Sequence, residues 1–283
     1  MVLSAEPIIY GLIFMYEIRH RYADMAPFLE KLLALEPEKT HYGVQAKYYR
    51  FLAEGSLESF HAFEEAVRNV SRTDQCDVRS VQNFEMIVAM VNDDFDTYAQ
   101  DWAGKWARHY AGHGDWACPM VINDEANQAH LLMERGRTGE AQTIIDKAKT
   151  ATTRPYTEMS MCIFDRAAFY PKLEFMSGDK EQALHSLETA VPGVLTNDAF
   201  PRGAVERSVL LETADLVAPD RVYDLYRDIV EDPVSLVSME TVCANPWIFP
   251  NLLRDPRFIQ EVRQDGRFVE FLEHYGIIPS TTG

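Results

Sequence analysis

The chain has 283 residues, 47% of them hydrophobic, and its 44 acidic and 27 basic residues give a net charge of −17. An electrostatic field of this sign repels nucleic-acid phosphates and anionic lipid headgroups, which argues against nucleic acid and membrane surfaces as partners. A basic protein partner would suit the charge, although the same charge equally suits a chain that it simply keeps soluble.

Cysteine usage and hydrophobic length indicate a reducing, cytoplasmic setting. Cys76, Cys118, Cys162 and Cys243 lie far apart in the sequence and include no Cys-x-x-Cys pair, so they form neither a disulfide framework nor a zinc knuckle. The apolar run from Pro7 to Tyr16 is too short to cross a bilayer and lacks the flanking residues of a secretion signal.

Apolar residues recur along most of the chain at the three-to-four spacing of amphipathic helices, as in Phe60, Phe63, Ala66 and Val67. Strand-like alternation is nearly absent, so the sequence predicts an all-α fold. Glycines and prolines divide the chain into helices at short intervals. The predicted helix stops are Pro37, Gly55, Gly136, Pro155, Gly178, Pro192, Pro219 and Pro233.

Two segments repeat the same pattern without a gap. One begins at Gly136 and the other at Gly178, and each follows a helix-like run. In both segments an alanine stands five residues after the glycine, a large aliphatic residue nine after it, and a second alanine twelve after it. These positions are Ala141, Ile145 and Ala148 in the first segment, and Ala183, Leu187 and Ala190 in the second.

This pattern resembles the tetratricopeptide repeat, in which a glycine ends the first helix of a pair and small residues let the two helices approach closely. A weaker copy begins at Gly55, while the family's Trp, Leu-Gly and Tyr positions are mostly not met. The resemblance implies a single superhelical domain over residues 1–283, built of about six degenerate helix pairs. Their turns are expected near residues 22, 55, 92, 136, 178 and 218.

Pro171 interrupts the helix expected over residues 156–176. An interior proline removes a backbone donor and clashes with the preceding turn, so we expect a break near 168–170.

The C-terminal residues from Asn251 to Phe258 resemble the closing segment of tetratricopeptide-like modules in bacterial multidomain signalling proteins. Asp255 is expected to cap a helix that has Pro256 at its first position, with Phe258, Ile259 and Val262 facing inward. We expect residues 245–283 to form a capping segment that closes the exposed end of the array.

Two constellations suggest metals and are weighed against plain structural roles. His109, His113 and Cys118 are zinc-ligand types, with Asp115 between them, but glycines interrupt the helix that would align them. We therefore expect no metal site there.

The run from Asp93 to Asp96 is similar to the magnesium-binding helix of isoprenoid synthases, which makes a helical magnesium-dependent phosphate or diphosphate enzyme using Asp93 and Asp96 the alternative function. The required second acidic motif is missing, and acids also favour helix starts. No nucleophile, phosphate-loop or dinucleotide motif is present. The sequence therefore predicts a non-enzyme that uses no cofactor.

The resemblance implies that the first helix of each pair lines a concave groove that holds a partner protein or peptide, as in a scaffold or the regulatory part of a signalling protein. A small-molecule sensor with its ligand near Pro171 is a third possibility. Counting back from the turns gives the expected partner-binding residues: Tyr42, Gln45, Tyr49, Arg79, Gln82, Asn123, His130, Asp165 and Lys172.

Overall fold

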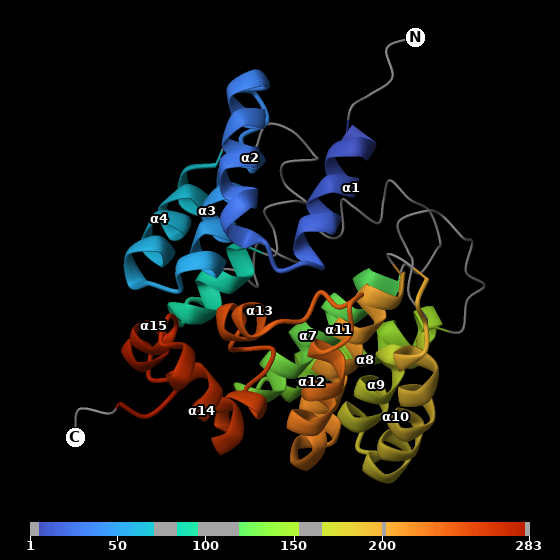
Figure 1. Cartoon of the computed structure of the whole chain (residues 1–283). Coiled ribbons are helices and arrows are strands. Elements are labelled where there is room, and N and C mark those ends of the chain that lie inside the picture. The colour runs from blue at the N-terminus through green and yellow to red at the C-terminus, as the bar shows by residue number, and fades with distance from the viewer. Residues whose placement is uncertain (1–5, 71–83, 96–118, 153–165, 200–201, 281–283) are drawn as a thin grey trace. The chain divides into compact units, whose positions relative to one another are not determined.

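The computed structural model describes residues 6–70, 84–95, 119–152, 166–199 and 202–280 (Figure 1). Within these ranges the chain is helical and contains no strand, which confirms the all-α class. The chain divides into two compact units. Unit 1 combines Met1–Gly104 with Ser238–Gly283, and unit 2 is Lys105–Val237. A single array over 1–283 stays a prediction.

Unit 1 begins with two helix pairs. α1 (Glu6–Glu17) is followed by α2 (Tyr22–Leu35), and α3 (His41–Glu54) by α4 (Leu57–Asn69). α3 packs against both α2 and α4, and the three helices lie side by side (Figure 1). Residues 84–91 form a further helix, which ends in a turn at 92–93.

Gly55 makes the turn between α3 and α4. Its φ of +66° is left-handed, a conformation that glycine adopts at little cost. Ser56 then caps α4, because its Oγ accepts a hydrogen bond from the Ser59 backbone N–H at 3.2 Å. A Cβ at Gly55 would stand 2.7 Å from the backbone carbonyl carbon of Arg267, so another segment of the chain also requires glycine here.

The end of the chain adds α13 (Met239–Ala244), α14 (Pro256–Asp265) and α15 (Val269–His274) to unit 1. Asp255 caps α14 as predicted: its side chain accepts from the Arg257 backbone N–H at 2.8 Å, and Pro256 is the first helical residue. Phe258 and Val262 are buried as predicted, whereas Ile259, also predicted to face inward, is only half-buried.

The C-terminal segment packs on the second helix pair of unit 1. The ring centroids of Phe268 and Phe271 lie 5.4 and 4.9 Å from that of Phe51, in edge-to-face arrangements. Tyr275 adds a similar contact to Phe60. This segment belongs to the same compact unit as the first helices, whose aromatic rings offer it an apolar surface. That it closes the exposed end of an array stays a prediction.

The described residues of unit 2 form three successive helix pairs, coloured green to orange in Figure 1. α9, the first helix of the middle pair, packs against helices of both neighbouring pairs as well as its own partner α10. The pairs are α7 (Pro119–Glu134) with α8 (Thr138–Thr152), α9 (Tyr170–Met176) with α10 (Lys180–Leu195), and α11 (Arg202–Val217) with α12 (Val222–Val230).

The two repeated segments form the turns and second helices of the first two pairs. Gly136 and Gly178 both have positive φ and end the first helix of their pair. All six small and aliphatic positions that the repeat shares are buried: Ala141, Ile145, Ala148, Ala183, Leu187 and Ala190.

Two prolines behave differently. The break predicted at 168–170 is present: a 3₁₀ turn over Arg166–Ala168 ends there, and α9 starts at Tyr170 with Pro171 in its first turn, where no backbone donor is needed. Pro192, predicted to stop a helix, does not do so. α10 continues past it to Leu195, and because Pro192 lies near the helix end its missing hydrogen bond disturbs little.

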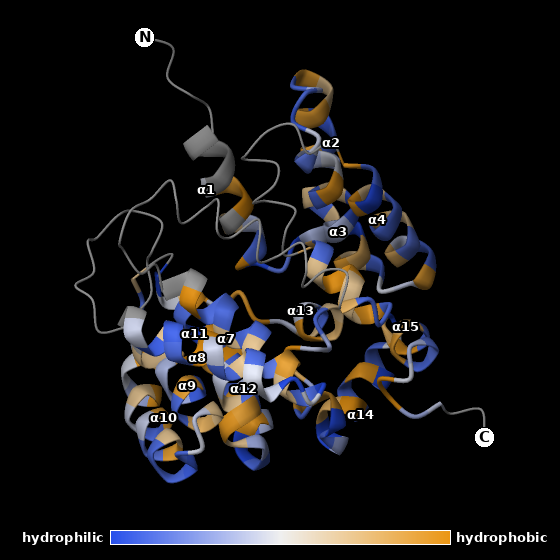
Figure 2. Ribbon diagram, turned by 180° about the vertical axis from the view of Figure 1, so that it is seen from behind, coloured by the Kyte–Doolittle hydropathy of each residue, from blue (hydrophilic) through white to orange (hydrophobic). Residues whose placement is uncertain are grey.

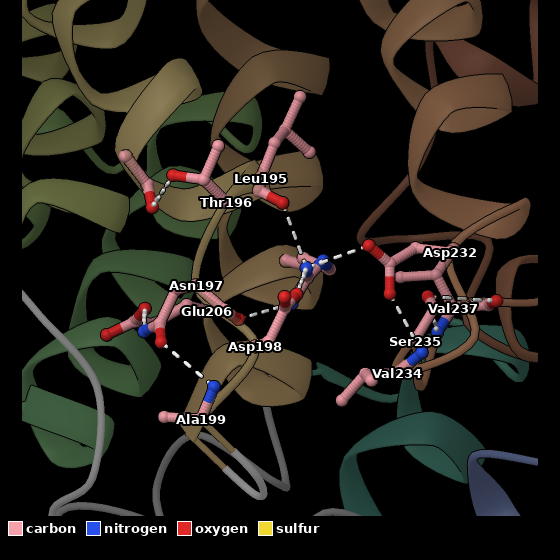
Figure 3. A network of polar contacts seen from close by, with 12 residues as sticks. Leu195, Thr196, Asn197, Asp198, Ala199, Glu206, Asp232, Val234, Ser235 and Val237 are labelled. Carbon is pink, nitrogen blue, oxygen red and sulfur yellow. Dashed lines mark hydrogen bonds and ion pairs between the residues drawn. The ribbon is translucent and has the colours of Figure 1, made fainter.

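α11 is buried on nearly all sides, and its buried residues include the charged Glu206, Arg207 and Asp215. Figure 2 shows hydrophilic and hydrophobic residues together along this helix. The guanidinium of Arg207 is fully buried. It donates to the backbone oxygens of Leu195 and Asn197 at 3.0 and 2.8 Å and to the carboxylate of Asp232 at 2.8 Å. Figure 3 shows these acceptors converging from the loop after α10 and the turn after α12. Arg207 thus connects the end of α10 and the turn after α12 to α11.

Gly203 lets the loop pass over the start of α11. A Cβ at this position would stand 1.9 Å from the backbone oxygen of Asn197 and 2.7 Å from a guanidinium nitrogen of Arg207. The close approach of backbone to backbone therefore requires glycine and positions the carbonyl that Arg207 binds.

Candidate functional site

A polar cluster joins the first helices of the three pairs in unit 2. Asn123 and Asn127 lie one turn apart on α7, Lys172 comes from α9 and Glu212 from α11. These four residues are called the first-helix cluster below. Its members reach one another because α9 packs between α7 and α11.

The ammonium of Lys172 is at the centre of the first-helix cluster. Its Nζ donates to the side-chain oxygens of Asn123 at 3.2 Å and Asn127 at 2.5 Å, and lies 3.5 Å from a carboxylate oxygen of Glu212. The two amide nitrogens in turn donate to the same Glu212 oxygen, at 3.1 and 3.3 Å. Because lysine offers only donors, both amides turn their oxygens to Lys172 and their NH₂ groups to Glu212.

Burial decides the electrostatics of Lys172. The residue is 2% exposed, and loss of water lowers the pKa of its ammonium, while the negative charges of Glu212, Asp124 and Asp215 act to raise it. A buried ammonium needs such partners, because its desolvation costs on the order of several kcal/mol when no partner compensates for the lost water. The first-helix cluster is therefore a satisfied network that fixes the side chains of three helices.

His130 lies one turn beyond Asn127 on α7 and reaches solvent, with 21% of its side chain exposed. Its ring is 3.7 Å from the carboxylate of Glu134. Burial is the main cause that lowers the pKa of His130; the charge of Lys172 lowers it further and Glu134 opposes both. The ring is consequently neutral at pH 7 and can both donate and accept a hydrogen bond.

The structure thus brings together Asn123 and Lys172 and places His130 beside them, three residues that the sequence had assigned to a partner-binding face. Sequence reasoning missed Asn127 and Glu212. Asn127 had a usable signal, because it follows Asn123 at the four-residue spacing of one helix face. Arg79, Gln82 and Asp165 lie outside the described residues.

The candidates in unit 1 are in a different situation. Tyr42 is 1% exposed, Tyr49 is also buried, and Gln45 is half-buried. The ring of Tyr49 stacks on that of Tyr22 from α2, with centroids 6.2 Å apart. Neighbouring helices therefore cover this face of α3, and in this conformation the two tyrosines do not present their rings to a partner.

The metal candidates gain no support from geometry. His109, His113, Asp115 and Cys118 lie outside the described residues, as does Asp96. Asp93 occupies the turn after residues 84–91, in a left-handed conformation with φ of 55°. Among the residues that the structure describes, no three His, Cys, Asp or Glu side chains gather as a metal site would require.

Compared with known proteins, the chain matches no family model, no curated protein and no solved structure. Within the described ranges, no helix is both long enough and apolar enough to cross a bilayer. What the first-helix cluster does must be inferred from its own residues.

Proposed function

We propose that this chain is a protein–protein interaction module, a tetratricopeptide-like array that binds a partner protein or peptide on the first helices of unit 2. One observation carries the proposal: amide, ammonium and carboxylate groups from three successive first helices converge in the first-helix cluster, with the half-buried His130 at its edge. A row of fixed polar groups across several helices suits the recognition of an extended segment.

The repeat pattern supports the array. The turns at Gly136 and Gly178 are each followed, five residues later, by a fully buried alanine, Ala141 and Ala183. α9 packs against both neighbouring pairs, which is the arrangement expected when helix pairs stack in succession. Such stacking leaves the first helices along one face, which is where the polar cluster lies.

Glu212 and His130 form the edge of the first-helix cluster, and their chemistry favours a partner that carries N–H donors and a basic side chain. Glu212 is slightly exposed and has oxygens left to accept, whereas the positive charge of Lys172 is buried beneath it. The net charge of −17 would also speed the approach of a basic partner. A cytoplasmic scaffold or the regulatory part of a signalling protein would use such a face.

The test is capture of partners from native lysate by the full chain, compared with Glu212→Gln and His130→Ala. Both changes alter the edge; because Glu212→Gln also removes the carboxylate that pairs with the buried ammonium of Lys172, circular dichroism and thermal denaturation check that the fold is kept. Glu140→Gln on α8 is the matched control, because its carboxylate is exposed and pairs only locally with Arg137 at 2.7 Å. We expect partners on the wild type and the control and fewer on the edge variants. Equal capture by all four proteins would show that the face is not the binding site.

A further inference from the structure

The first-helix cluster of unit 2 holds an amine, a carboxamide and a carboxylate within reach of one another. Nζ of Lys172 lies 2.5 Å from the side-chain oxygen of Asn127, so the amine stands against the carbonyl end of this amide. The amide nitrogen of Asn127 lies 3.3 Å from a carboxylate oxygen of Glu212, and the same oxygen lies 3.5 Å from Nζ. One carboxylate oxygen therefore reaches both the amine and the nitrogen that leaves if the amine attacks the amide carbon.

Burial and fixation favour a reaction between these groups. Lys172 and Asn127 are buried, and they come from helices α9 and α7, which pack together. An amine and an amide held in contact in this way can reach an effective concentration on the order of 10⁵ M. Loss of water lowers the pKa of the Lys172 ammonium, against the opposing charge of Glu212, and so increases the share of neutral amine that can attack a carbonyl carbon. Burial also keeps water, the competing nucleophile, away from the amide.

We propose that Lys172 and Asn127 join in an intramolecular isopeptide bond, with Glu212 as the general acid and base of the reaction. The bond between Nζ and Cγ of Asn127 forms, and the bond between Cγ and the amide nitrogen breaks. Glu212 relays two protons from Nζ to the departing nitrogen, which leaves as an ammonium ion. An ammonium and a carboxamide thus become a secondary amide and an ammonium ion, so the step transfers no electrons and needs no co-reactant.

The distances favour Asn127 over Asn123 as the acylating residue. The side-chain oxygen of Asn123 is 3.2 Å from Nζ, farther than that of Asn127, whereas its amide nitrogen donates to Glu212 at 3.1 Å. Asn123 therefore holds the carboxylate in place while Asn127 reacts. The product covalently connects α7 to α9, the first helices of two successive pairs. The inference does not rest on partner binding, because every reacting group belongs to this chain.

The intact mass of the purified full chain, measured under denaturing conditions, tests the proposal. Each protein is compared with the mass calculated from its own sequence, and we expect the wild type to be lighter by one ammonia, about 17 Da. Lys172→Arg keeps the charge but offers no nucleophilic amine, and Glu212→Gln lacks the acid and base, so both should keep the full mass. Lys147→Arg is the matched control and should show the loss, because Lys147 is exposed and pairs with the carboxylate of Glu125.

Digestion with trypsin locates the bond. Residues 109–135, which include Asn127, should stay joined to residues 167–180. The second peptide should remain uncleaved after Lys172, since trypsin does not cut after a lysine whose side chain is part of an amide. Fragmentation of the joined pair then shows which asparagine is bound.

Three results on the wild type would contradict the proposal. A chain of full mass would overturn it, and so would a loss of ammonia without joined peptides, as when an asparagine closes onto its own backbone. A bond to Asn123 would overturn the assignment of Asn127. These measurements decide the question even where a variant folds poorly, and neither involves a partner, so their outcome is separate from that of the capture experiment.

Discussion

The second helix pair of unit 1 and helix α11 of unit 2 are buried among different kinds of side chain. Around Phe51 on α3, rings from α4 and from the C-terminal segment meet edge to face, with centroids of Phe60 and Phe271 at 5.2 and 4.9 Å. Around α11, by contrast, Glu206, Arg207 and Asp215 are buried among paired polar groups. The same helical architecture thus accommodates an aromatic core and a charged one.

Substitutions should therefore destabilise the two units in different ways. Aromatic rings gain mainly from the area they bury, so unit 1 should lose stability in proportion to the volume removed. Buried charges depend on specific partners, so unit 2 should suffer when one partner is removed alone and recover when both are replaced by apolar groups.

The largest effect is expected for Phe51→Ala. This ring contacts four others, including Phe268 and Phe271 of the C-terminal segment, so its removal leaves a cavity and weakens the attachment of that segment. We expect the free energy of unfolding to fall by about 4 kcal/mol. Urea denaturation measures the loss, and hydrogen exchange should show faster opening of α14 and α15. Phe28→Ala, a half-buried ring on α2, should cost clearly less; an equal cost would contradict a core centred on Phe51.

The next effect is expected for Arg207→Leu. The leucine leaves the Asp232 carboxylate and two backbone oxygens without their buried donor, which should cost about 3 kcal/mol. Adding Asp232→Leu should restore part of the loss, and denaturation of the single and double variants measures the coupling. Arg221→Leu is the control: its pair with Glu188 is exposed on both sides and should contribute about 0.5 kcal/mol or less. No recovery in the double variant would show that Asp232 is not the critical partner.

Local signals in the sequence predicted much of the fold. Gly136 and Gly178, with the alanines that follow them, placed two turns and their seams, and Pro171 placed a break, because each acts on its own backbone or on an adjacent helix. The packing of Phe268 on Phe51 joins residues more than two hundred positions apart, and no local pattern encodes such a contact.

The candidate site was predictable only in part, for a related reason. Counting back from a turn indicates which side of a helix a residue occupies, and this placed Asn123 and Lys172 on neighbouring helices. It does not indicate what covers that side, so Tyr49 was assigned to an open groove although α1 and α2 lie over it. Glu212 was missed because α11, buried on nearly all sides, shows no amphipathic pattern from which to infer a face.

The smallest effect is expected for Asp255→Ala, which sharpens the contrast between surface and buried polar contacts. Asp255 caps α14 and binds the Arg257 side chain at the surface, so its loss should cost about 1 kcal/mol, below the cost of removing Arg207. Hydrogen bonds from Arg257 hold the pKa of the Asp255 carboxyl below its ordinary value of 3.8. A lowered pKa means that the stabilisation is present above 3.8 and is lost as the pH falls through the lowered value. The difference between wild type and variant in denaturant midpoint should therefore be constant from pH 5 to pH 8 and shrink in acid. If Asp255→Ala lowered the free energy of unfolding as much as Arg207→Leu does, surface polar contacts would stabilise the protein as strongly as buried ones, which would contradict the contrast.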